Sequence, residues 1–384
     1  MAQTLKFGNG TWATKKGSTL AFNDEDGNYK PLPFTTTRAT GATRVNKEGL
    51  IEVVENDRPR IDYTDSAKGA LLLEPQRTNL ITYSEDFSQW FQIGTATITS
   101  NYGVSPDGTQ NSSRLQMNAS DKIYFTVASS GDISFTVYLK GVGQIRLRDN
   151  TSTGLKDVTL TSEWVRYELN FNATISNFQI EQQTGVSDFE IYGAQVEQGS
   201  YASSYIPTQG ASATRLADTA SGSGNSEVFN DSEGVLFANI SALTNIGTDR
   251  RIAISDGSIS NRVFFYYAPN TDQISAIIVS GGVTQVNIPI IGVQDKNNKF
   301  AIKYKVNDVS FWVNGFEIDT DIVATMPSNL SELAFDDGSG ANDFYGKTKE
   351  LAYYNTILTD LELETLTSYS SLSELVTELN LNTL

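Results

Sequence analysis

The sequence predicts an all-β protein made of two consecutive antiparallel β-sandwiches, with an irregular N-terminal segment and short C-terminal helices. The composition includes 17 Tyr, 19 Phe and 30 Gly and is rich in Thr, Ser and Asn, which favours strands and turns over helices. Apolar and polar residues alternate with the two-residue period of strands in several stretches. A chain of 384 residues exceeds one typical domain of roughly 100 to 200 residues, so we expect two or three domains.

Charge and missing residue types exclude several classes of function. The formal net charge of −17 repels phosphate backbones and anionic lipid, so nucleic acid is not expected as a partner. The chain has no Cys and no His, which removes thiolate nucleophiles, sulfur metal sites and the usual general base. It also has no run of 18 apolar residues and does not begin like a signal peptide. We therefore expect synthesis in the cytoplasm and no membrane insertion.

The first 70 residues contain turn signals more than long alternating segments. Asn9-Gly10, Asp26-Gly27 and the stretch from Pro31 to Pro33 mark turns between short extended pieces. Such a segment does not easily form its own core, so we expect it to pack on a neighbouring domain, another subunit or a larger assembly. We assign residues 1–70 to attachment or oligomerisation.

Residues 71–218 alternate as a sandwich or jelly roll would. Ile133, Phe135, Val137 and Leu139 alternate with polar residues, and a similar stretch follows Trp164. For each of these strands we expect one buried face and one solvent-exposed face.

Residues 219–370 are assigned to a second sandwich. Its first part, Thr219 to Asn230, is rich in Ser and Gly and is expected to be a linker or loose loop. Further on, alternation from Phe300 to Val306 and from Val309 to Val313 is punctuated by Asn307-Asp308 and Asn314-Gly315, which suit tight turns. This pattern predicts a three-stranded meander that ends at Phe316 to Asp319.

Helix is expected only at the end of the chain. Thr359 with Glu362 and Ser371 with Glu374 have the spacing of capping boxes, and each pair opens a short segment rich in Leu. Residues 371–384 are assigned to a short helical tail. We interpret these helices as a lid on the sandwich or as a subunit contact without chemistry of its own.

Two long phrases resemble a known family. LLLEPQRTNLITYSEDFSQW (71–90) and GAQVEQGSYASSYIPTQGASATRLAD (193–218) resemble the two ends of a module found in bacteriophage tail-fibre, head-fibre and other virion appendage proteins. Residues 35–63 resemble the segment that usually leads into that module. The resemblance implies a carbohydrate-binding-type β-sandwich over about residues 71–216. It also implies a homo-oligomer, most often a trimer, on the outer surface of a virion. A structural role for Arg77 and Arg215, which lie inside the phrases, is favoured over contact with a ligand.

The C-terminal part resembles laminin-G-like and concanavalin-A-like sandwiches. The order of the phrases KYK (303–305), FWVNG (311–315), FYGK (344–347) and ELAYYN (350–355) carries this resemblance. It implies a second fold of the kind that binds glycans, although a fold alone does not establish binding.

Glu317 and Asp321 are the candidate catalytic pair. The segment Glu317-Ile318-Asp319-Thr320-Asp321 resembles the catalytic strand of laminarinases and lichenases, with Glu317 as nucleophile and Asp321 in the acid position. Retaining chemistry needs the two carboxyl groups about 5 to 5.5 Å apart, and that family has Glu where Asp321 stands. The favoured interpretation is an acidic strand face exposed to solvent, so we do not expect the protein to be an enzyme.

Two acidic segments are candidates for calcium. Asp336, Asp337 and Asp343, with Asn342, lie in a loop where related folds hold Ca²⁺ or a sugar, and the alternative is a loop whose side chains satisfy their own turn. Asn23 to Asn28 resembles the start of an EF-hand loop. Position 12 of that loop would be Thr35 rather than Glu, so an exposed polar turn is favoured there. No other cofactor is expected.

Aromatic side chains are the candidates for stacking on sugar rings, with amide groups such as that of Asn342 for the hydroxyls. Each of these aromatic residues would also suit a core, and the sequence does not choose between the two roles. The candidates are Trp90, Phe91, Tyr102, Tyr266 and Tyr267.

These observations leave three hypotheses. The first is a virion fibre or appendage protein that attaches without catalysis to glycans on the host surface and joins other virion proteins through its N-terminal segment. The second is a capsid-decoration or tail-assembly component that binds no glycan. The third is a glycan depolymerase that uses Glu317 and Asp321.

Overall fold

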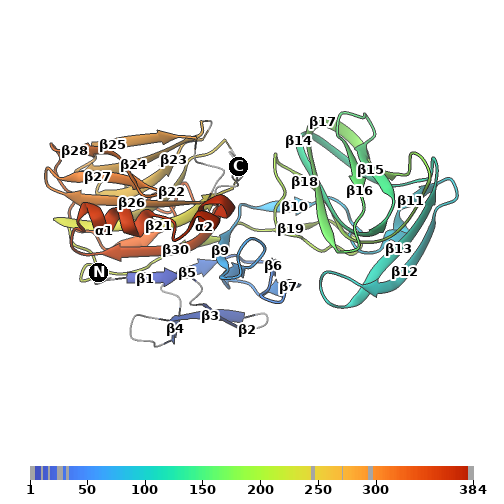
Figure 1. The fold of residues 1–384 in the computed structure, drawn as a ribbon, viewed down its shortest axis with the longest axis horizontal. Helices are drawn as coiled ribbons and strands as arrows, with labels where there is room; N and C mark the ends of the chain where they lie inside the picture. Colours follow the sequence, from blue (N-terminus) through green and yellow to red (C-terminus); the bar gives the residue numbers. More distant parts are fainter. Residues whose placement is uncertain are drawn as a thin grey trace. The chain divides into compact units, whose positions relative to one another are not determined.

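The computed structural model describes residues 5–9, 12–15, 18–23, 29–31, 34–243, 247–269, 271–292 and 297–378. The chain forms two compact units, each discontinuous in sequence. The first unit comprises residues 1–38, 57–75 and 218–384, and the second comprises residues 39–56 and 76–217. Both consist mainly of antiparallel strands, and the two α-helices of the described residues lie at the C-terminal end (Figure 1), so the all-β prediction is confirmed.

The first unit contains an eight-stranded sheet in the order β28-β27-β26-β21-β30-β9-β8, with β1 also paired to β30. Its strands come from both ends of the chain. They are β1 (Leu5–Gly8), β8 (Arg60–Asp62), β9 (Ala70–Leu73), β21 (Glu233–Ala242), β26 (Asn298–Lys305), β27 (Val309–Val313), β28 (Phe316–Asp321) and β30 (Gly346–Tyr354).

A five-stranded sheet in the order β25-β24-β23-β22-β29 forms the opposite layer of the first unit. Its strands are β22 (Arg250–Ser255), β23 (Arg262–Tyr267), β24 (Gln273–Ser280), β25 (Val283–Ile291) and β29 (Glu332–Ala334). Two small sheets complete this unit. They contain β2 (Trp12–Lys15), β3 (Ser18–Asn23) and β4 (Tyr29–Pro31), and β5 (Thr35–Thr37) paired with β20 (Thr219–Ser221).

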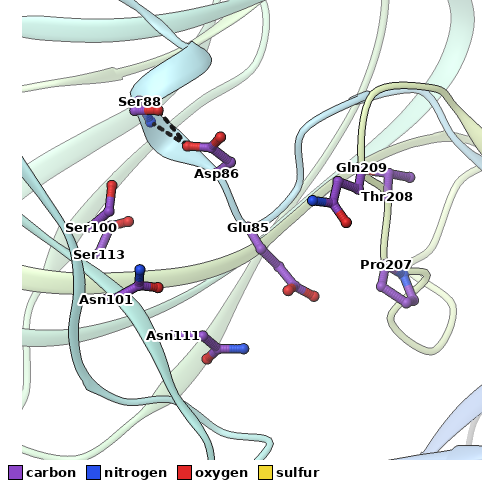
Figure 2. Close-up of a pocket in the computed structure, with 10 residues that line it drawn as sticks. All are labelled: Glu85, Asp86, Ser88, Ser100, Asn101, Asn111, Ser113, Pro207, Thr208 and Gln209. Atoms are coloured by element: carbon purple, nitrogen blue, oxygen red, sulfur yellow. Dashed lines mark hydrogen bonds between the residues drawn. The ribbon is translucent and has the colours of Figure 1, made fainter.

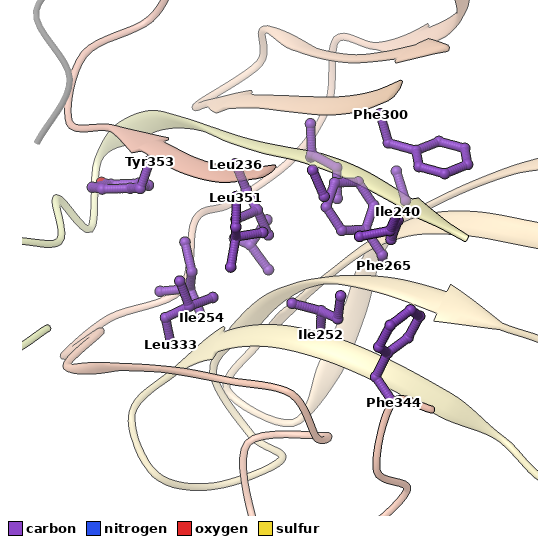
Figure 3. Close-up of a cluster of buried hydrophobic side chains, with 14 of the residues drawn as sticks. Leu236, Ile240, Ile252, Ile254, Phe265, Phe300, Leu333, Phe344, Leu351 and Tyr353 are labelled. Carbon is purple, nitrogen blue, oxygen red and sulfur yellow. The ribbon is translucent and has the colours of Figure 1, made fainter. Parts of the chain in front are cut away.

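The main core of the first unit lies between these two sheets (Figure 3). Alternation along the strands supplies it: Phe300 and Ile302 of β26 face Phe265 of β23 and Ile252 of β22, all with no measurable exposure. Burial of this much apolar surface is the main force that holds two such sheets together.

The predicted meander is confirmed as β26, β27 and β28. Its two turns lie where expected, with positive φ at Asn307 (57°), Asn314 (52°) and Gly315 (89°). Asn and Gly adopt this left-handed region more easily than other residues do, which is why the dipeptides were informative.

The helices follow the capping prediction in part. Helix α1 (Asp360–Thr367) begins with a complete capping box between Thr359 and Glu362. Helix α2 (Leu372–Glu378) is capped by the Ser371 hydroxyl, but the Glu374 carboxylate accepts from the Ser370 backbone N–H instead of completing the box. Leu363 of α1 packs with Trp312 in a small core on the outer side of the eight-stranded sheet, as a lid would.

The expectation of a loose linker at residues 219–230 is wrong. Thr219–Ser221 forms β20, which pairs with β5, and Ser223 bridges to Leu333. Ala220 and Phe229 are buried in the main core, so these two side chains anchor a segment whose composition suggested a linker or a loose loop.

The second unit is built on an eight-stranded sheet in the order β12-β13-β18-β14-β17-β15-β16, with β11 paired to the start of β14. The long strands β14 and β17 pair along most of their length and shift register once. The bounds are β11 (Phe91–Ile93), β12 (Thr97–Val104), β13 (Gln110–Asn118), β14 (Lys122–Val142), β15 (Gln144–Asp149), β16 (Leu155–Thr159), β17 (Val165–Glu181) and β18 (Val186–Gln198).

Two two-stranded sheets and a 3₁₀ helix complete the second unit. They are β6 (Ala42–Val45) paired with β7 (Ile51–Val54), β10 (Arg77–Asn79) paired with β19 (Ala213–Arg215), and the 3₁₀ helix η1 (Phe87–Gln89). Arg77 and Arg215 are register partners, and the buried Arg215 guanidinium donates to the Ser203 and Ser204 hydroxyls. Both arginines therefore lie where the two family-like phrases meet.

The predicted buried face of β14 is confirmed, because Ile133, Phe135, Val137 and Leu139 have no measurable exposure. The prediction that the opposite face is solvent-exposed is wrong at Ser134 and Thr136, which are also buried. Residues that follow β18 cover this side of the sheet. The Ile206 N–H donates to the Gln195 side-chain oxygen, and the Gln195 amide donates to the Ser204 carbonyl. Gln195 is the strand register partner of Thr136. Alternation alone could not reveal this cover, since the covering segment contains no strand pattern.

Among the described residues, no helix has both the length and the apolar character needed to cross a membrane.

Candidate functional site

The second unit contains an open cleft of about 540 Å³. Its lining consists of carboxylate, amide and hydroxyl side chains together with one proline, and no described aromatic residue takes part (Figure 2). The lining residues are Glu85, Asp86, Ser88, Ser100, Asn101, Asn111, Ser113, Pro207, Thr208 and Gln209.

Three parts of the unit bring these residues together. The segment after β10 leads into η1, and Asp86 caps that helix by accepting from the Ser88 backbone N–H at 3.1 Å. Strands β12 and β13 supply the opposite wall. There the pairing is interrupted between Thr99 and Gly103, and Asn101 has a positive φ of 52°. Such an irregularity changes the direction of side chains along a strand, which places both Ser100 and Asn101 at the cleft.

The third part is the segment from Pro207 to Gln209, which is tied to the first by buried hydrogen bonds. Thr208 N–H donates to Ser84 Oγ at 2.8 Å, and Thr208 Oγ1 donates to the Ile81 carbonyl at 2.6 Å. A bridge between Tyr83 and Gln209 continues this pairing. The two family-like phrases thus form adjacent walls of one cleft.

Two tyrosine hydroxyls lie within hydrogen-bond distance of Glu85. The Tyr205 hydroxyl donates to Glu85 Oε1 at 2.9 Å, and the Tyr192 hydroxyl lies 3.1 Å from the same oxygen. Figure 2 shows the Glu85 side chain extending between Asn111 and Pro207. Burial raises the pKa of Glu85, and the negative charge of Asp107 adds to this rise. The two tyrosine hydrogen bonds act in the opposite direction.

Asp107 is the second carboxylate of this network. Burial alone would raise its pKa, but hydrogen bonds from Thr109, Ser105 and Asn111 outweigh that effect, so the pKa of Asp107 is lowered. The Tyr192 hydroxyl also lies 3.1 Å from Asp107 Oδ2. One hydroxyl proton cannot serve two carboxylates at once, so the Tyr192 hydroxyl donates to either Glu85 or Asp107.

Asn79 fixes the same region from the core side. Its fully buried side chain makes four hydrogen bonds: its amide donates to the Ala194 and Ile206 carbonyls, and its oxygen accepts from the Ile81 and Val196 backbone N–H groups. This residue joins the first phrase to the second, which explains a local requirement for an amide at this position.

The predicted sugar-stacking residues separate into buried and exposed sets. Trp90 is 3% exposed, and its indole N–H donates to the Tyr83 carbonyl at 3.1 Å. Tyr267 is 1% exposed within the main core of the first unit. Burial therefore removes Trp90 and Tyr267 as sites for stacking on a sugar.

Phe91 and Tyr102 are exposed, and Tyr266 is half-buried. Phe91 stacks on Tyr124 with ring centres 5.1 Å apart, while the Arg114 guanidinium lies 4.9 Å from the centre of the Tyr102 ring. The Tyr266 hydroxyl donates to Asp249 at 3.1 Å, and Tyr266 belongs to the other unit. None of these rings lines the cleft, although Tyr102 directly follows Asn101.

The loop predicted to bind metal or sugar does bring its acidic residues together. Asp337 accepts from the Ser339 hydroxyl at 2.7 Å and from the Asn342 amide at 2.9 Å, so its carboxylate is used by its own loop. Burial raises the pKa of Asp343 to about 6, and the charges of Asp336 and Asp337 contribute. Within the described ranges, no three acidic residues are arranged to hold a metal ion. The segment from Asp24 to Asn28 lies outside those ranges.

Glu317 and Asp321 lie on β28, the edge strand of the eight-stranded sheet. Opposite them the register shifts between Phe311, which pairs with Asp319, and Trp312, which pairs with Glu317. This bulge interrupts the alternation that the catalytic interpretation needs. Glu317 is exposed, and Asp321 accepts from the Val323 backbone N–H at 2.7 Å.

Comparison with known proteins gives fold-level similarity only. No family model matches the sequence, and no curated protein matches it either. The structure is similar to the CBM40 module of a Ruminococcus gnavus IT-sialidase (16% identity, 36% of this chain and 84% of that one, TM-score 0.32). It is also similar to a Bacillus licheniformis β-glucanase (14%, 38% and 73%, TM-score 0.27). For domains LG4–5 of mouse laminin α1 the values are 8%, 74% and 96%, with a TM-score of 0.26. At these TM-scores the similarity supports no conclusion about a site.

Sequence reasoning missed the residues of the cleft. Glu85, Thr208 and Gln209 all lie inside the family-like phrases, so their positions were marked without a role. Asn101 carried no signal, because its place in the cleft depends on an irregular strand pair.

Proposed function

We propose that this protein binds glycans without cleaving them, and that the cleft of the second unit is the binding site. The observation that carries the proposal is the cleft's lining, in which carboxylate, amide and hydroxyl groups surround about 540 Å³ of accessible space. Sugar hydroxyls both donate and accept hydrogen bonds, so a mixed lining of this kind suits them. Buried hydrogen bonds around Asn79 and Thr208 hold the walls in place, which lowers the entropic cost of binding.

The proposed biological setting is the outer surface of a bacteriophage, where the protein would act as a fibre or appendage. Support comes from the sequence phrases 71–90 and 193–218, which also meet at the cleft through the Tyr83–Gln209 bridge and the Thr208–Ser84 hydrogen bond. In this setting an oligomer, with a trimer favoured, would combine several weak contacts into firm attachment to host glycans. Other virion proteins would be the partners of the N-terminal segment.

A structural virion component is the second candidate. Several apolar side chains of the first unit are strongly exposed, with values of 72% for Phe316, 73% for Ile322 and 78% for Val323. Exposed apolar groups of this kind are more common at protein interfaces than elsewhere on a surface. This role would need no glycan.

A glycan array with the full chain tests the first candidate. We expect saturable binding that Asn101→Gly and Gln209→Ala each weaken about tenfold, because each removes a hydrogen-bonding amide from the cleft, and Gly keeps the positive φ of position 101. Asn56→Ala and Gln92→Ala remove exposed amides of the same unit outside the cleft and should leave binding unchanged. Absence of binding on arrays and on host cells would refute glycan binding and favour the structural role. Binding that neither cleft variant changes would refute the site.

A further inference from the structure

We propose that the cleft selects neutral and amino sugars and rejects sugars that carry a carboxylate or sulfate. The inference rests on the proposed function and names the ligand class of the same site. Its first basis is charge: the described residues that line the cleft include the carboxylates of Glu85 and Asp86 and no lysine or arginine. An acidic sugar would meet like charge there without a compensating cation.

Strand β13 contains one arginine, Arg114, whose guanidinium pairs with a carboxylate that does not line the cleft. Arg114 adjoins the lining residue Ser113, but its guanidinium donates through Nε to Asp188 Oδ1 at 2.8 Å and lies over the Tyr102 ring. In a strand, neighbouring side chains point to opposite faces, so Arg114 and Ser113 face different sides of β13. Arg114 is therefore not positioned to receive an anion in the cleft.

The second basis is an excess of hydrogen-bond acceptors. Asn111 donates its amide to Asp107 at 3.0 Å, so this donor is already engaged within the protein. Glu85 and Asp86 contribute carboxylate oxygens, which only accept hydrogen bonds when ionised, to the same cleft. A ligand rich in donors, such as an amine or several hydroxyls, satisfies these oxygens, whereas a carboxylate or sulfate supplies only acceptors.

Asp107 adds a further carboxylate to the hydrogen-bond network of Glu85. Four hydrogen bonds from Ser105, Thr109 and Asn111 stabilise its negative charge. The Tyr192 hydroxyl connects it to Glu85. A protonated Glu85 would reduce the repulsion of an anion, but Asp86 and Asp107 would remain. Near a protein surface, like charges at contact distance change an equilibrium constant about tenfold or more.

The test compares binding of polymer-coupled glucosamine, N-acetylglucosamine, glucuronic acid and sialic acid to the 384-residue chain, alongside a broad glycan array. We expect the protein's cleft-dependent ligands to be neutral or amino sugars, with acidic sugars at least about tenfold weaker. Cleft dependence is defined by loss of binding in Asn101→Gly, which keeps the positive φ of that position. If acidic sugars are the strongest cleft-dependent ligands, the charge inference is overturned while glycan binding stands. If no sugar binds, the proposed function fails and the inference fails with it.

Two variants test the cause. Gln209→Lys places a cation at an exposed lining position and should raise binding of acidic sugars about tenfold relative to neutral ones. Glu85→Gln combined with Asp86→Asn should also raise the binding of acidic sugars relative to that of neutral sugars. Asn still caps a helix well, so the second change should leave η1 intact. Gln92→Lys, outside the cleft, is the matched control for added charge. An unchanged ratio in folded Gln209→Lys protein would contradict the proposal.

Discussion

At the scale of single residues, the second unit depends on polar groups that have no exposure to water. Asn79 satisfies four backbone groups at once, two carbonyls and two N–H groups, at the junction of the two sequence phrases. Each buried backbone group that loses its partner costs about 1 to 3 kcal/mol. The residue is therefore more important to stability than its small size suggests.

Asn79→Ala should destabilise the second unit by at least about 4 kcal/mol, because four buried backbone groups lose their partners at about 1 kcal/mol or more each. Urea denaturation followed by tryptophan fluorescence measures the change, since Trp90 lies in the affected core. Asn56→Ala removes only one long hydrogen bond from an exposed position and serves as control. A loss below about 0.5 kcal/mol for Asn79→Ala would show that the junction is held by other contacts.

Asp343 in the first unit predicts a pH effect. Its pKa is about 6 in the folded protein and about 4 in an unfolded chain, because of burial and then of the charges of Asp336 and Asp337. The folded state thus binds the proton more tightly, so this group's contribution to stability falls as pH rises from about 4 to about 6 and stays low above that.

Asp343→Asn should therefore raise the free energy of unfolding at pH 7, by on the order of 1 kcal/mol, and the gain should disappear near pH 4. The Asn oxygen can still accept from the Tyr345 hydroxyl, which donates to Asp343 at 3.2 Å. Thermal unfolding between pH 4 and pH 7 measures this, with exposed Asp319→Asn as control. Equal destabilisation at every pH would mean that the carboxylate itself is needed.

At the scale of elements, strands with a clear period could be predicted, and the pairing of irregular ones could not. The meander of β26 to β28 followed from alternation and two Asn turns. In contrast, Ala70–Leu73 reads as a strand from its Leu run alone, but only long-range register shows that it pairs with β30. The cleft was invisible for the same reason, since its walls come from β12, β13 and two segments without regular period.

Strand β28 also determines what the acidic pair can do. The bulge near Ile318 and the exposure of Glu317 leave that carboxylate in contact with solvent. We expect Glu317→Gln to leave glycan binding unchanged, and we expect the unmodified protein to release no shortened products from bound glycans. Product analysis by mass spectrometry checks this. Cleavage that Glu317→Gln abolishes would restore the depolymerase hypothesis.

At the scale of the whole molecule, the chain passes between the two units four times, after residues 38, 56, 75 and 217. Residues of the first unit beside these passages form a buried ionic cluster. Arg60 pairs with Glu74 at 2.7 Å and with Asp218, and Arg38 pairs with Asp218 at 2.8 Å. Removal of one partner from such a cluster leaves a buried charge uncompensated, so the cluster fixes where these segments meet in the first unit.

The second unit likewise depends on residues far apart in sequence. Thr43 Oγ1 donates to the Tyr205 carbonyl at 2.5 Å, Ile51 N–H donates to the Pro106 carbonyl at 2.9 Å, and Leu216 N–H donates to Thr40 Oγ1 at 3.0 Å. Val54 of the β6–β7 hairpin is buried. A fragment that begins at residue 76 would lack all the contacts of this hairpin.

We therefore expect a fragment of residues 39–217 to be more stable than a fragment of residues 76–217. The hairpin contributes buried hydrogen bonds and apolar contact worth at least about 2 kcal/mol, which corresponds to a melting temperature about 4 to 8 °C higher for a fragment of this size. Circular dichroism melting curves of the two fragments measure the difference. A third fragment, residues 39–217 with Thr43→Ala and Val54→Ala, should fall between them. Identical melting temperatures for the two unmodified fragments would mean that residues 39–56 only rest on a unit that is complete without them.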